Sequence, residues 1–440
     1  MSTETKNKLV PRFRFPEFQN DGKWEVKRLG EIGDFFNGGT PDTKNEDYWN
    51  GDILWFTPSE IKKKYLKESN RKITELGLKN SSAKLLPKGS ILITTRATIG
   101  DVGIALIECT TNQGFQSLVV KQNNSNEFWY YYIFNNKSEL DKRASGSTFK
   151  EITKSKIISI PVLAPSLPEQ QKIASCLSSL DELIEAESQK LELYELHKKG
   201  LMQNLFPNSL NCDSQGLNDG KDFSKVPKLR FPEFQNDGEW EEKRLGEIGE
   251  LLGGLNGKNA EDFGEGYPFI TYMQVFKKSI IDFKECNKVK INEGEHQNIV
   301  KKGDILFTAS SETPDEVGFA SVITEEPATP TYLNSFCFIL RAEHNFPIIP
   351  EFSRYLFHSS TYRKSVIAIA QGITRYNISK NTFKGMSIPF PSLPEQQQIA
   401  SCLSSLDDLI NAQRQKIELL KQHKKGLLQG LFPNVNEINL

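Results

Sequence analysis

The sequence predicts a duplicated protein of the α/β (α+β) class, in which two globular domains with β-rich cores are joined by two long, antiparallel, coiled-coil-like helices. Three observations lead to this fold class. Two sequence blocks each occur twice in the 440 residues. One of these blocks carries an apolar seam with coiled-coil spacing, and the segments between the blocks have strand composition. An internal duplication also predicts a pseudo-two-fold relation between the halves.

Length and composition limit the class of protein. A chain of 440 residues exceeds one ordinary core and favours two or three domains. No apolar run approaches the roughly 18 residues of a membrane span, and the amino terminus lacks an apolar signal core. The six cysteines form no C-x-x-C pair, so neither a zinc site nor a disulfide framework is expected, and the expected location is cytoplasmic. A net charge of −1 provides no global attraction to polyanions.

The repeated blocks form a frame around two inserts. Residues 10–33 return as 226–249 with four differences, and residues 166–207 return as 392–433 with eleven. The intervening segments share only short anchors. This pattern predicts one scaffold that presents two different recognition surfaces. The expected organisation is a first recognition domain at 1–165, a spacer helix at 166–207, a linker at 208–225, a second recognition domain at 226–391, a second spacer helix at 392–433 and a tail at 434–440.

The second block reads as a long helix in both copies. Pro168 and Pro394 suit a first helical turn, and Pro207 and Pro433 close the far ends. Apolar residues follow the 4,3 spacing of a coiled-coil seam, with Ile173, Leu177, Leu180, Ile184 and Leu191 in the first copy and Ile399, Leu403, Leu406, Ile410 and Ile417 in the second. Polar residues interrupt the seam at equivalent positions, Glu187 and Lys198 in one copy and Gln413 and Lys424 in the other. Each helix is expected to pack antiparallel on its duplicate, and a helical hairpin that stabilises each half separately is the alternative.

Strand and helix composition alternate within the inserts. Strands are expected near 90–95, 117–120, 304–308 and 335–340, where β-branched and aromatic residues lie between glycine turns. Residues 127–140 and 351–369 have helical composition. Each insert is long enough for a core of its own.

Catalytic signatures are absent from the sequence. It contains no P-loop, no G-x-S-x-G and no H-E-x-x-H, so no catalytic residue and no metal ligand is assigned. Asp42, Glu60 and Lys62 resemble the carboxylate–lysine set of Mg²⁺-dependent nucleases, but the second half has no equivalent. A nuclease that uses these three residues is the enzymatic alternative.

Polar clusters at the ends of expected strands are the candidate DNA-binding residues. Arg, Gln, Asn, Ser and Thr read base edges or grip phosphates. The candidates are Thr94, Thr95, Arg96, Gln113, Gln116, Ser145, Ser147, Thr148 and Lys150 in the first insert, and Thr308, Ser310, Ser311, Asn334, Gln371, Thr374, Arg375, Tyr376 and Lys380 in the second. A lysine-dense stretch at 62–88 is equally compatible with DNA contact and with a solvated face.

Several motifs resemble the specificity subunits of type I restriction–modification enzymes. They are WEVKRLGEIG at 24–33, GSIL at 89–92 and PSLPEQQKIA at 165–174, together with Thr40-Pro41 and WFTPSEI at 55–61. The second insert departs from the last pattern and has FITY at 269–272. The resemblance covers essentially the whole chain.

The resemblance implies a non-catalytic subunit that recognises a bipartite, asymmetric double-stranded DNA target. It implies two modification subunits, which methylate adenine N6, and ATP-dependent restriction subunits as partners. No cofactor is expected in this chain, because S-adenosylmethionine, ATP and Mg²⁺ would belong to those partners. A protein–protein adaptor is the non-enzymatic alternative, and it predicts no sequence preference on DNA.

Overall fold

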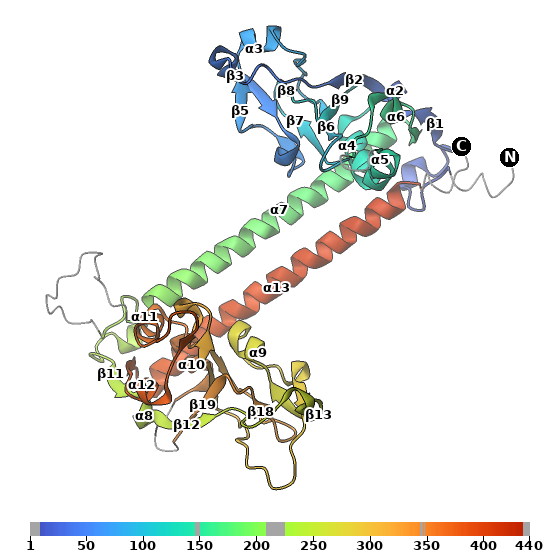
Figure 1. Ribbon diagram of the computed structural model, residues 1–440. Coiled ribbons are helices and arrows are strands. Elements are labelled where there is room, and N and C mark those ends of the chain that lie inside the picture. The colour runs from blue at the N-terminus through green and yellow to red at the C-terminus, as the bar shows by residue number, and fades with distance from the viewer. Residues whose placement is uncertain (1–8, 146–149, 208–224, 344–345, 347, 434–440) are drawn as a thin grey trace. The chain divides into compact units, whose positions relative to one another are not determined.

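A computed structural model describes residues 9–145, 150–207, 225–343, 346 and 348–433 (Figure 1). The chain divides into two compact units. The first unit joins residues 1–188 to 415–440, and the second comprises residues 189–414. Each unit therefore contains one insert together with a segment of each long helix. Residues 208–224 of the expected linker and the whole tail at 434–440 lie outside the described residues.

The first unit is built on two small sheets (Figure 1). The five-stranded sheet has the order β2 (Gly33–Asn37), β9 (Phe115–Val120), β6 (Ile91–Thr94), β7 (Val102–Ala105) and β4 (Tyr65–Leu66). The three-stranded sheet has the order β5 (Arg71–Ile73), β3 (Trp49–Phe56) and β8 (Cys109–Thr111). The helices are α2 (Leu29–Ile32), α3 (Glu75–Lys79), α4 (Asn126–Asn135), α5 (Lys137–Arg143) and α6 (Lys154–Ile158).

The second unit repeats this plan, with a main sheet of four strands in place of five. Its main sheet has the order β12 (Gly249–Gly253), β19 (Cys337–Ala342), β15 (Ile305–Thr308) and β17 (Ala320–Val322). A three-stranded sheet has the order β14 (Asn287–Val289), β13 (Phe263–Ile270) and β18 (Tyr332–Leu333), and β16 (Ser310–Ser311) pairs with β20 (Tyr376–Asn377). The helices are α8 (Leu245–Ile248), α9 (Tyr272–Lys277), α10 (Pro350–Leu356), α11 (Ser360–Ala368) and α12 (Lys380–Lys384).

An inner strand of each main sheet separates two cores. In β6, Ile91 and Ile93 join the large core, while Leu92 points to the core formed with the three-stranded sheet. Successive side chains of a strand face opposite ways, so a continuous apolar run indicates burial on both faces. In β15, Ile305 and Phe307 face the large core and Leu306 faces the smaller one. The strands expected at 90–95 and 304–308 are thus confirmed, as are those at 117–120 and 335–340.

A short antiparallel ribbon joins the two ends of each insert. β1 (Glu25–Arg28) pairs with β10 (Pro161–Ala164), and β11 (Glu241–Arg244) pairs with β21 (Ser387–Phe390). The registers are equivalent, with Glu25 opposite Ala164 and Glu241 opposite Phe390. The first strand of each ribbon belongs to the first repeated block. The frame thus holds the start and end of each insert side by side.

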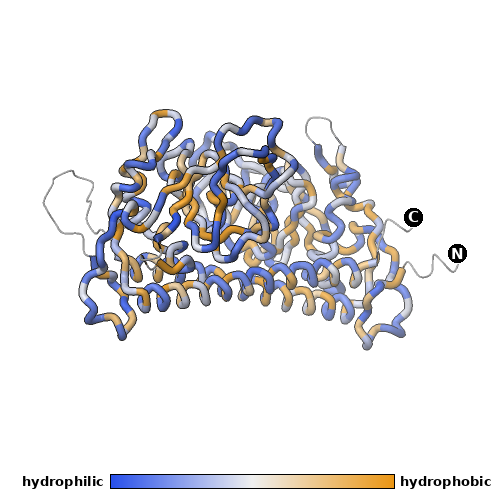
Figure 2. Tube along the Cα trace, turned by 90° about the horizontal axis from the view of Figure 1, so that it is seen from below, coloured by the Kyte–Doolittle hydropathy of each residue, from blue (hydrophilic) through white to orange (hydrophobic). Residues whose placement is uncertain are grey.

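The two long helices are continuous. α7 runs over Leu167–Asn204 and α13 over Leu393–Leu431, which confirms the helices expected at 166–207 and 392–433. Apolar and polar residues alternate along their turns (Figure 2). Ion pairs give their direction within each unit: Asp181 with Lys424 and Glu187 with Lys416 in the first, and Glu195 with Arg414 and Lys198 with Asp407 in the second. Residue numbers rise along one helix as they fall along the other, so the two helices are antiparallel in each unit.

The helices expected at 127–140 and 351–369 are each two helices. Asn136 ends α4 and precedes α5 with a non-helical backbone, and its side-chain amide donates to the Tyr132 carbonyl. In the second unit, Ser359 starts α11, and its hydroxyl accepts the Tyr362 backbone N–H. Short polar side chains compete for backbone hydrogen bonds and so interrupt a helix.

The far ends of the long helices close the cores. In the first unit, the Phe432 ring centroid lies 6.4 Å from that of Trp24 and 5.4 Å from that of Phe128. In the second, Phe206 lies 6.0 Å from Trp240 and 5.8 Å from Phe352. The block that follows one insert therefore completes the core around the other insert, an arrangement that requires both copies of the block.

Candidate nucleic-acid interface

The three polar clusters predicted in the first insert lie together. The Thr95 backbone N–H donates to the Gly114 carbonyl at 2.8 Å, and the Ile152 N–H donates to the Thr95 carbonyl at 3.2 Å. Glu151 forms β-bridges with both Arg96 and Ser145. The turn after β6, the segment before β9 and the bridged residues Ser145 and Glu151 therefore share one patch of backbone hydrogen bonds.

Arg96 projects from a turn that the buried hydroxyl of Thr94 holds. Thr94 is fully buried, and its hydroxyl donates to the Thr98 carbonyl and accepts the Asp101 N–H. Ala97 has a φ of 59°, a left-handed conformation that costs a non-glycine residue about 1–2 kcal/mol. Strained backbone of this kind persists where the surrounding structure enforces it, and it is common at functional sites.

The charge of Arg96 is available for a ligand. Its guanidinium lies 2.8 Å from the Glu151 carboxylate, and the two side chains are 52% and 41% exposed. An exposed ion pair contributes only about 0–1 kcal/mol. A phosphate or a guanine edge could therefore replace Glu151 at small cost, because arginine binds both in a bidentate manner.

The second unit brings the equivalent segments together with different side chains. The Ala309 N–H donates to the Phe336 carbonyl at 2.8 Å, and the Ile378 N–H donates to the Ala309 carbonyl at 2.9 Å. β16 pairs with β20, which places Ser310 opposite Asn377. Gly372 has a φ of 147°, and a Cβ there would lie 2.0 Å from the Arg375 carbonyl oxygen. Only glycine allows this tight hairpin.

An aromatic hollow of about 230 Å³ lies beside this hairpin. The Arg375 guanidinium packs over the Phe336 ring, 5.0 Å from its centroid, and Tyr272 stacks on Phe276. Burial raises the pKa of Tyr272, so its phenol stays protonated and donates to the Ser310 carbonyl at 2.8 Å. Glu312 and Glu316 also line the hollow, and their negative charges disfavour phosphate there.

The predicted contact residues differ in exposure. Exposed members are Arg96, Gln113, Ser145, Lys150, Gln371, Thr374, Arg375 and Lys380, and half-buried members are Asn334 and Tyr376. Thr94, Thr95, Gln116, Thr308, Ser310 and Ser311 are buried. Ser147 and Thr148 lie outside the described residues. The buried members support the turns from below; the exposed members form the surface that a ligand can reach.

Three residues of these patches are not among the candidate contact residues. Glu151 restrains Arg96, and its equivalent Asn377 pairs with Ser310. The offset of 226 between the second repeated blocks would have aligned these two positions. Ile373, in the hairpin closed by the bridge between Gln371 and Asn377, is 93% exposed. Its sequence neighbours are polar, and no sequence periodicity marks it.

The lysine-dense stretch is not uniform. Lys62, Lys63 and Lys67 are exposed and remain available to a polyanion. The Lys64 ammonium is only 11% exposed and lies 2.5 Å from the Glu127 carboxylate. Lys64 is therefore occupied inside the protein.

The nuclease-like carboxylates have local structural roles. Glu60 accepts the backbone N–H groups of Thr57 and Asn70, both at 2.7 Å. Asp42 accepts the Lys44 N–H at 3.0 Å. Across the described part of the chain, no group of three or more His, Cys, Asp or Glu residues could hold a metal ion. The carboxylates thus cap turns in this structure.

The seam residues lie on the inner side of the long helices. Ile173, Leu177, Ile399, Leu403, Leu406, Ile410 and Ile417 are buried, and Leu180, Ile184 and Leu191 are half-buried. The polar interruptions face the opposite helix, because Glu187 pairs with Lys416 and Lys198 with Asp407.

None of the helices in the described part of the chain combines the length and the apolar character that a membrane span requires.

Comparison with known proteins identifies the family. A family model described as the type I restriction modification DNA specificity domain matches residues 21–195 and 237–422. The MjaIX specificity subunit of Methanocaldococcus jannaschii is 32% identical over 424 residues, which cover 93% of this chain and 92% of the relative. The EcoR124I/EcoR124II specificity subunit of Escherichia coli is 33% identical over 170 residues, 37% of this chain and 42% of the relative.

Solved structures share the fold. The S subunit from M. genitalium matches with a TM-score of 0.55 at 16% identity, over 97% of this chain and 100% of that one. The HsdS subunit from Thermoanaerobacter tengcongensis matches with a TM-score of 0.51 at 17% identity, over 95% and 99%. The repeated frame, the two β-rich inserts and the twofold domain match agree, and the chain belongs to the family of type I restriction–modification specificity subunits.

Proposed function

We propose that this chain recognises a bipartite, asymmetric DNA sequence through the two exposed patches described above. One observation carries the proposal: each unit assembles its patch from the same three backbone segments but covers it with different side chains. Arg96 and its ion pair dominate one patch, whereas Arg375, Phe336 and Ile373 dominate the other. Different donors and apolar groups read different base edges, so the two half-sites would differ in sequence.

The proposed role is positioning rather than catalysis. The acids of the nuclease alternative, Asp42 and Glu60, are engaged as turn caps. The chemistry would belong to modification subunits that use S-adenosylmethionine and to restriction subunits that use ATP and Mg²⁺. This chain would need no cofactor of its own, and the complex would act on cytoplasmic DNA.

Two equivalent apolar positions on the long helices support the binding of two modification subunits. Leu183 and its counterpart Leu409 are 42% and 51% exposed, and Leu193 and its counterpart Leu419 are both 65% exposed. Each unit carries one leucine of each pair. Leucines outside the seam and open to solvent suit a partner helix, and their duplication provides two such surfaces.

Stoichiometry tests the partner surfaces. Replacing Leu183 and Leu419 with Lys should remove one modification subunit from the complex, because both leucines belong to the first unit. Replacing Leu409 and Leu193 should remove the other, and the four-residue variant should bind none while keeping its fold. Native mass spectrometry counts the subunits, and retention of both on the four-residue variant would refute this surface.

Methylome sequencing tests the recognition proposal. The chain is co-expressed with its modification subunit, and single-molecule sequencing locates N6-methyladenine in the host DNA. We expect one split, asymmetric motif. Exchange of residues 34–165 for the insert of a relative should change one half of the motif only. A competent assembly that methylates no split motif would favour the adaptor alternative.

A further inference from the structure

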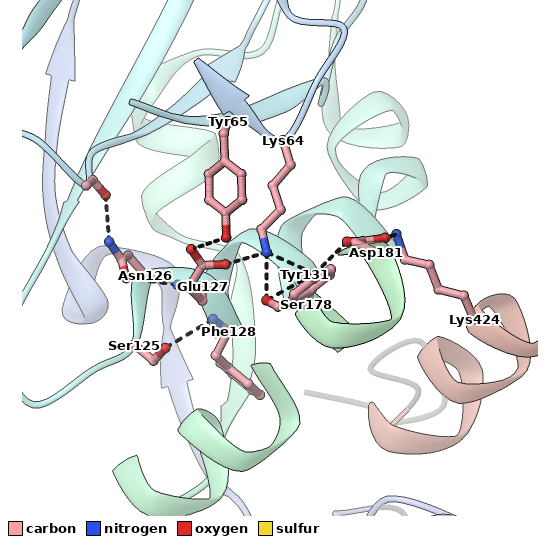
Figure 3. A network of polar contacts seen from close by, with 11 residues as sticks. Lys64, Tyr65, Ser125, Asn126, Glu127, Phe128, Tyr131, Ser178, Asp181 and Lys424 are labelled. Carbon is pink, nitrogen blue, oxygen red and sulfur yellow. Dashed lines mark hydrogen bonds and ion pairs between the residues drawn. The ribbon is translucent and has the colours of Figure 1, made fainter. Parts of the chain in front are cut away.

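A tyrosine, an aspartate and a lysine connect three elements of the first unit (Figure 3). Tyr131 on α4 donates its hydroxyl to Asp181 on α7 at 2.6 Å. The other oxygen of that carboxylate binds Lys424 on α13. The insert, the helix that follows it and the helix of the other repeat thus meet at one carboxylate. We call these three residues the Tyr–Asp–Lys lock.

The second unit contains the equivalent lock. Tyr355 on α10 donates its hydroxyl to Asp407 on α13 at 2.7 Å, and Lys198 on α7 lies 2.5 Å from the same carboxylate. Asp407 and Lys424 follow Asp181 and Lys198 by the same offset of 226 residues. In the first unit α7 provides the aspartate and α13 the lysine, whereas in the second unit α13 provides the aspartate and α7 the lysine.

Each insert adds a cation of its own to the duplicated lock. In the first unit, Lys64 donates to Tyr131 at 2.9 Å and to Ser178 at 2.8 Å, and it pairs with Glu127 (Figure 3). In the second, Arg354 on α10 binds Asp407 directly. The two cations reach different members of the lock, because Lys64 binds the tyrosine hydroxyl and Arg354 binds the aspartate carboxylate. Each insert therefore reinforces the lock by its own route.

The charged groups of the locks are largely shielded from water. Lys64 is 11% exposed, Lys424 19%, and Asp407 17%. Burial raises the pKa of Tyr131, and its hydrogen bond to Asp181 raises it further, so the phenol remains a donor. Hydrogen bonds to charged groups are strong when water is excluded. A shift of one helix along the other by a single turn would separate Asp181 from Lys424 and Asp407 from Lys198 together.

We propose that the two Tyr–Asp–Lys locks are positioning elements for DNA recognition, which fix the helix register and the seat of each insert and so set which half-site spacing is accepted. Lys198, Lys424, Asp181 and Asp407 would determine spacing without reading a base. This inference rests on the proposed function, since it assumes a split target. It assigns the two lysine interruptions of the seam, Lys198 and Lys424, a specific purpose.

The test measures spacing preference instead of total activity. Tyr131→Phe, Asp181→Asn and Lys424→Met are assembled with the modification subunit, as are Tyr355→Phe, Asp407→Asn and Lys198→Met. Methylation rates are compared on duplexes that carry the native motif and on duplexes with a spacer one base pair longer or shorter. We expect the lock variants to lower the ratio of native to altered rates about tenfold, about 1.4 kcal/mol, with unchanged half-site bases.

Matched variants distinguish positioning from folding. Lys425→Met and Lys199→Met change exposed neighbours of the lock lysines and should keep the native ratio, and Lys424→Arg should restore most of it. If both rates fall together at an unchanged ratio, or if the half-site bases change, the lock does not set spacing. A wild-type assembly without any split motif would overturn the proposed function as well, whereas a native motif with unaltered preference in every lock variant overturns the lock alone.

Discussion

A buried ion pair joins each copy of the first repeated block to a long helix, Arg14 with Glu169 and Arg230 with Glu395. The two pairs allow a matched stability measurement. Glu169 is 1% exposed and accepts two N–H groups from Arg14 at 2.8 and 2.7 Å, and the Trp24 indole N–H also donates to it at 3.2 Å. Glu395 accepts the same two bonds from Arg230. The Trp240 indole N–H is buried and, within the described residues, has no hydrogen-bond partner.

The expected cost follows from these contacts. Glu169→Ala and Glu395→Ala each leave a guanidinium that is 7% exposed without its carboxylate, and breaking a buried pair costs about 3–5 kcal/mol. Glu169→Ala also leaves the Trp24 indole unsatisfied, which adds about 1 kcal/mol. The first unit should therefore lose more stability than the second.

Hydrogen exchange followed by mass spectrometry is the suitable assay, because a chain of two compact units does not unfold in one step. Peptides from residues 9–33 and 167–180 report the first unit, and those from 226–249 and 393–406 report the second. Adding Arg14→Met to Glu169→Ala should recover part of the loss. A cost below about 1 kcal/mol, against the 3–5 expected of a buried pair, would refute the reasoning, as would a larger cost for Glu395→Ala.

Three further outcomes are expected. Arg96→Ala and Arg375→Ala should each cost about 1–3 kcal/mol of binding and relax specificity at one position if the arginine reads a base, or weaken all sequences alike if it contacts phosphate; unchanged binding by either variant in an electrophoretic or fluorescence assay removes that residue from the site. Leu406→Asp should destabilise the helix pair more than Leu180→Asp, since Leu406 is 7% exposed and Leu180 is half-buried, and equal unfolding midpoints would contradict this. Burial raises the pKa of Asp407, but hydrogen bonds from Lys198 and Tyr355 outweigh burial and hold that pKa below its ordinary value. The stability that the Asp407 carboxylate provides is complete above its unfolded-state pKa of about 3.9 and is lost as the pH falls through the folded value. Acid should therefore destabilise the second unit less in Asp407→Asn than in the wild type, as unfolding at low pH would measure.

Repetition made the frame predictable from the sequence. The long helices were found from seam spacing and from proline at both ends, because a helix that buries one face must repeat apolar residues along it. The exchange of helix ends between cores, with Phe432 in one and Phe206 in the other, was not found. Tertiary partners of this kind leave no periodic signal in a single sequence.

The candidate site was predicted only in part. Polar clusters at strand ends marked segments that the structure brings together, since turns there must expose backbone and short polar side chains. Composition could not separate Thr94, whose hydroxyl holds a turn, from Arg96, which faces solvent. It also treated Lys64 as one of several surface lysines, although the structure buries its ammonium against Tyr131 and Glu127. Burial is decided by distant segments, which sequence proximity does not report.

The ribbons that close each insert have an evolutionary consequence. β1 with β10, and β11 with β21, bring the start and end of an insert to neighbouring strands in equivalent register. A domain whose two ends are adjacent can gain, lose or exchange residues without moving its support. The family could therefore acquire a new DNA target by replacing one insert as a cassette, while the repeated frame and the long helices remain unchanged.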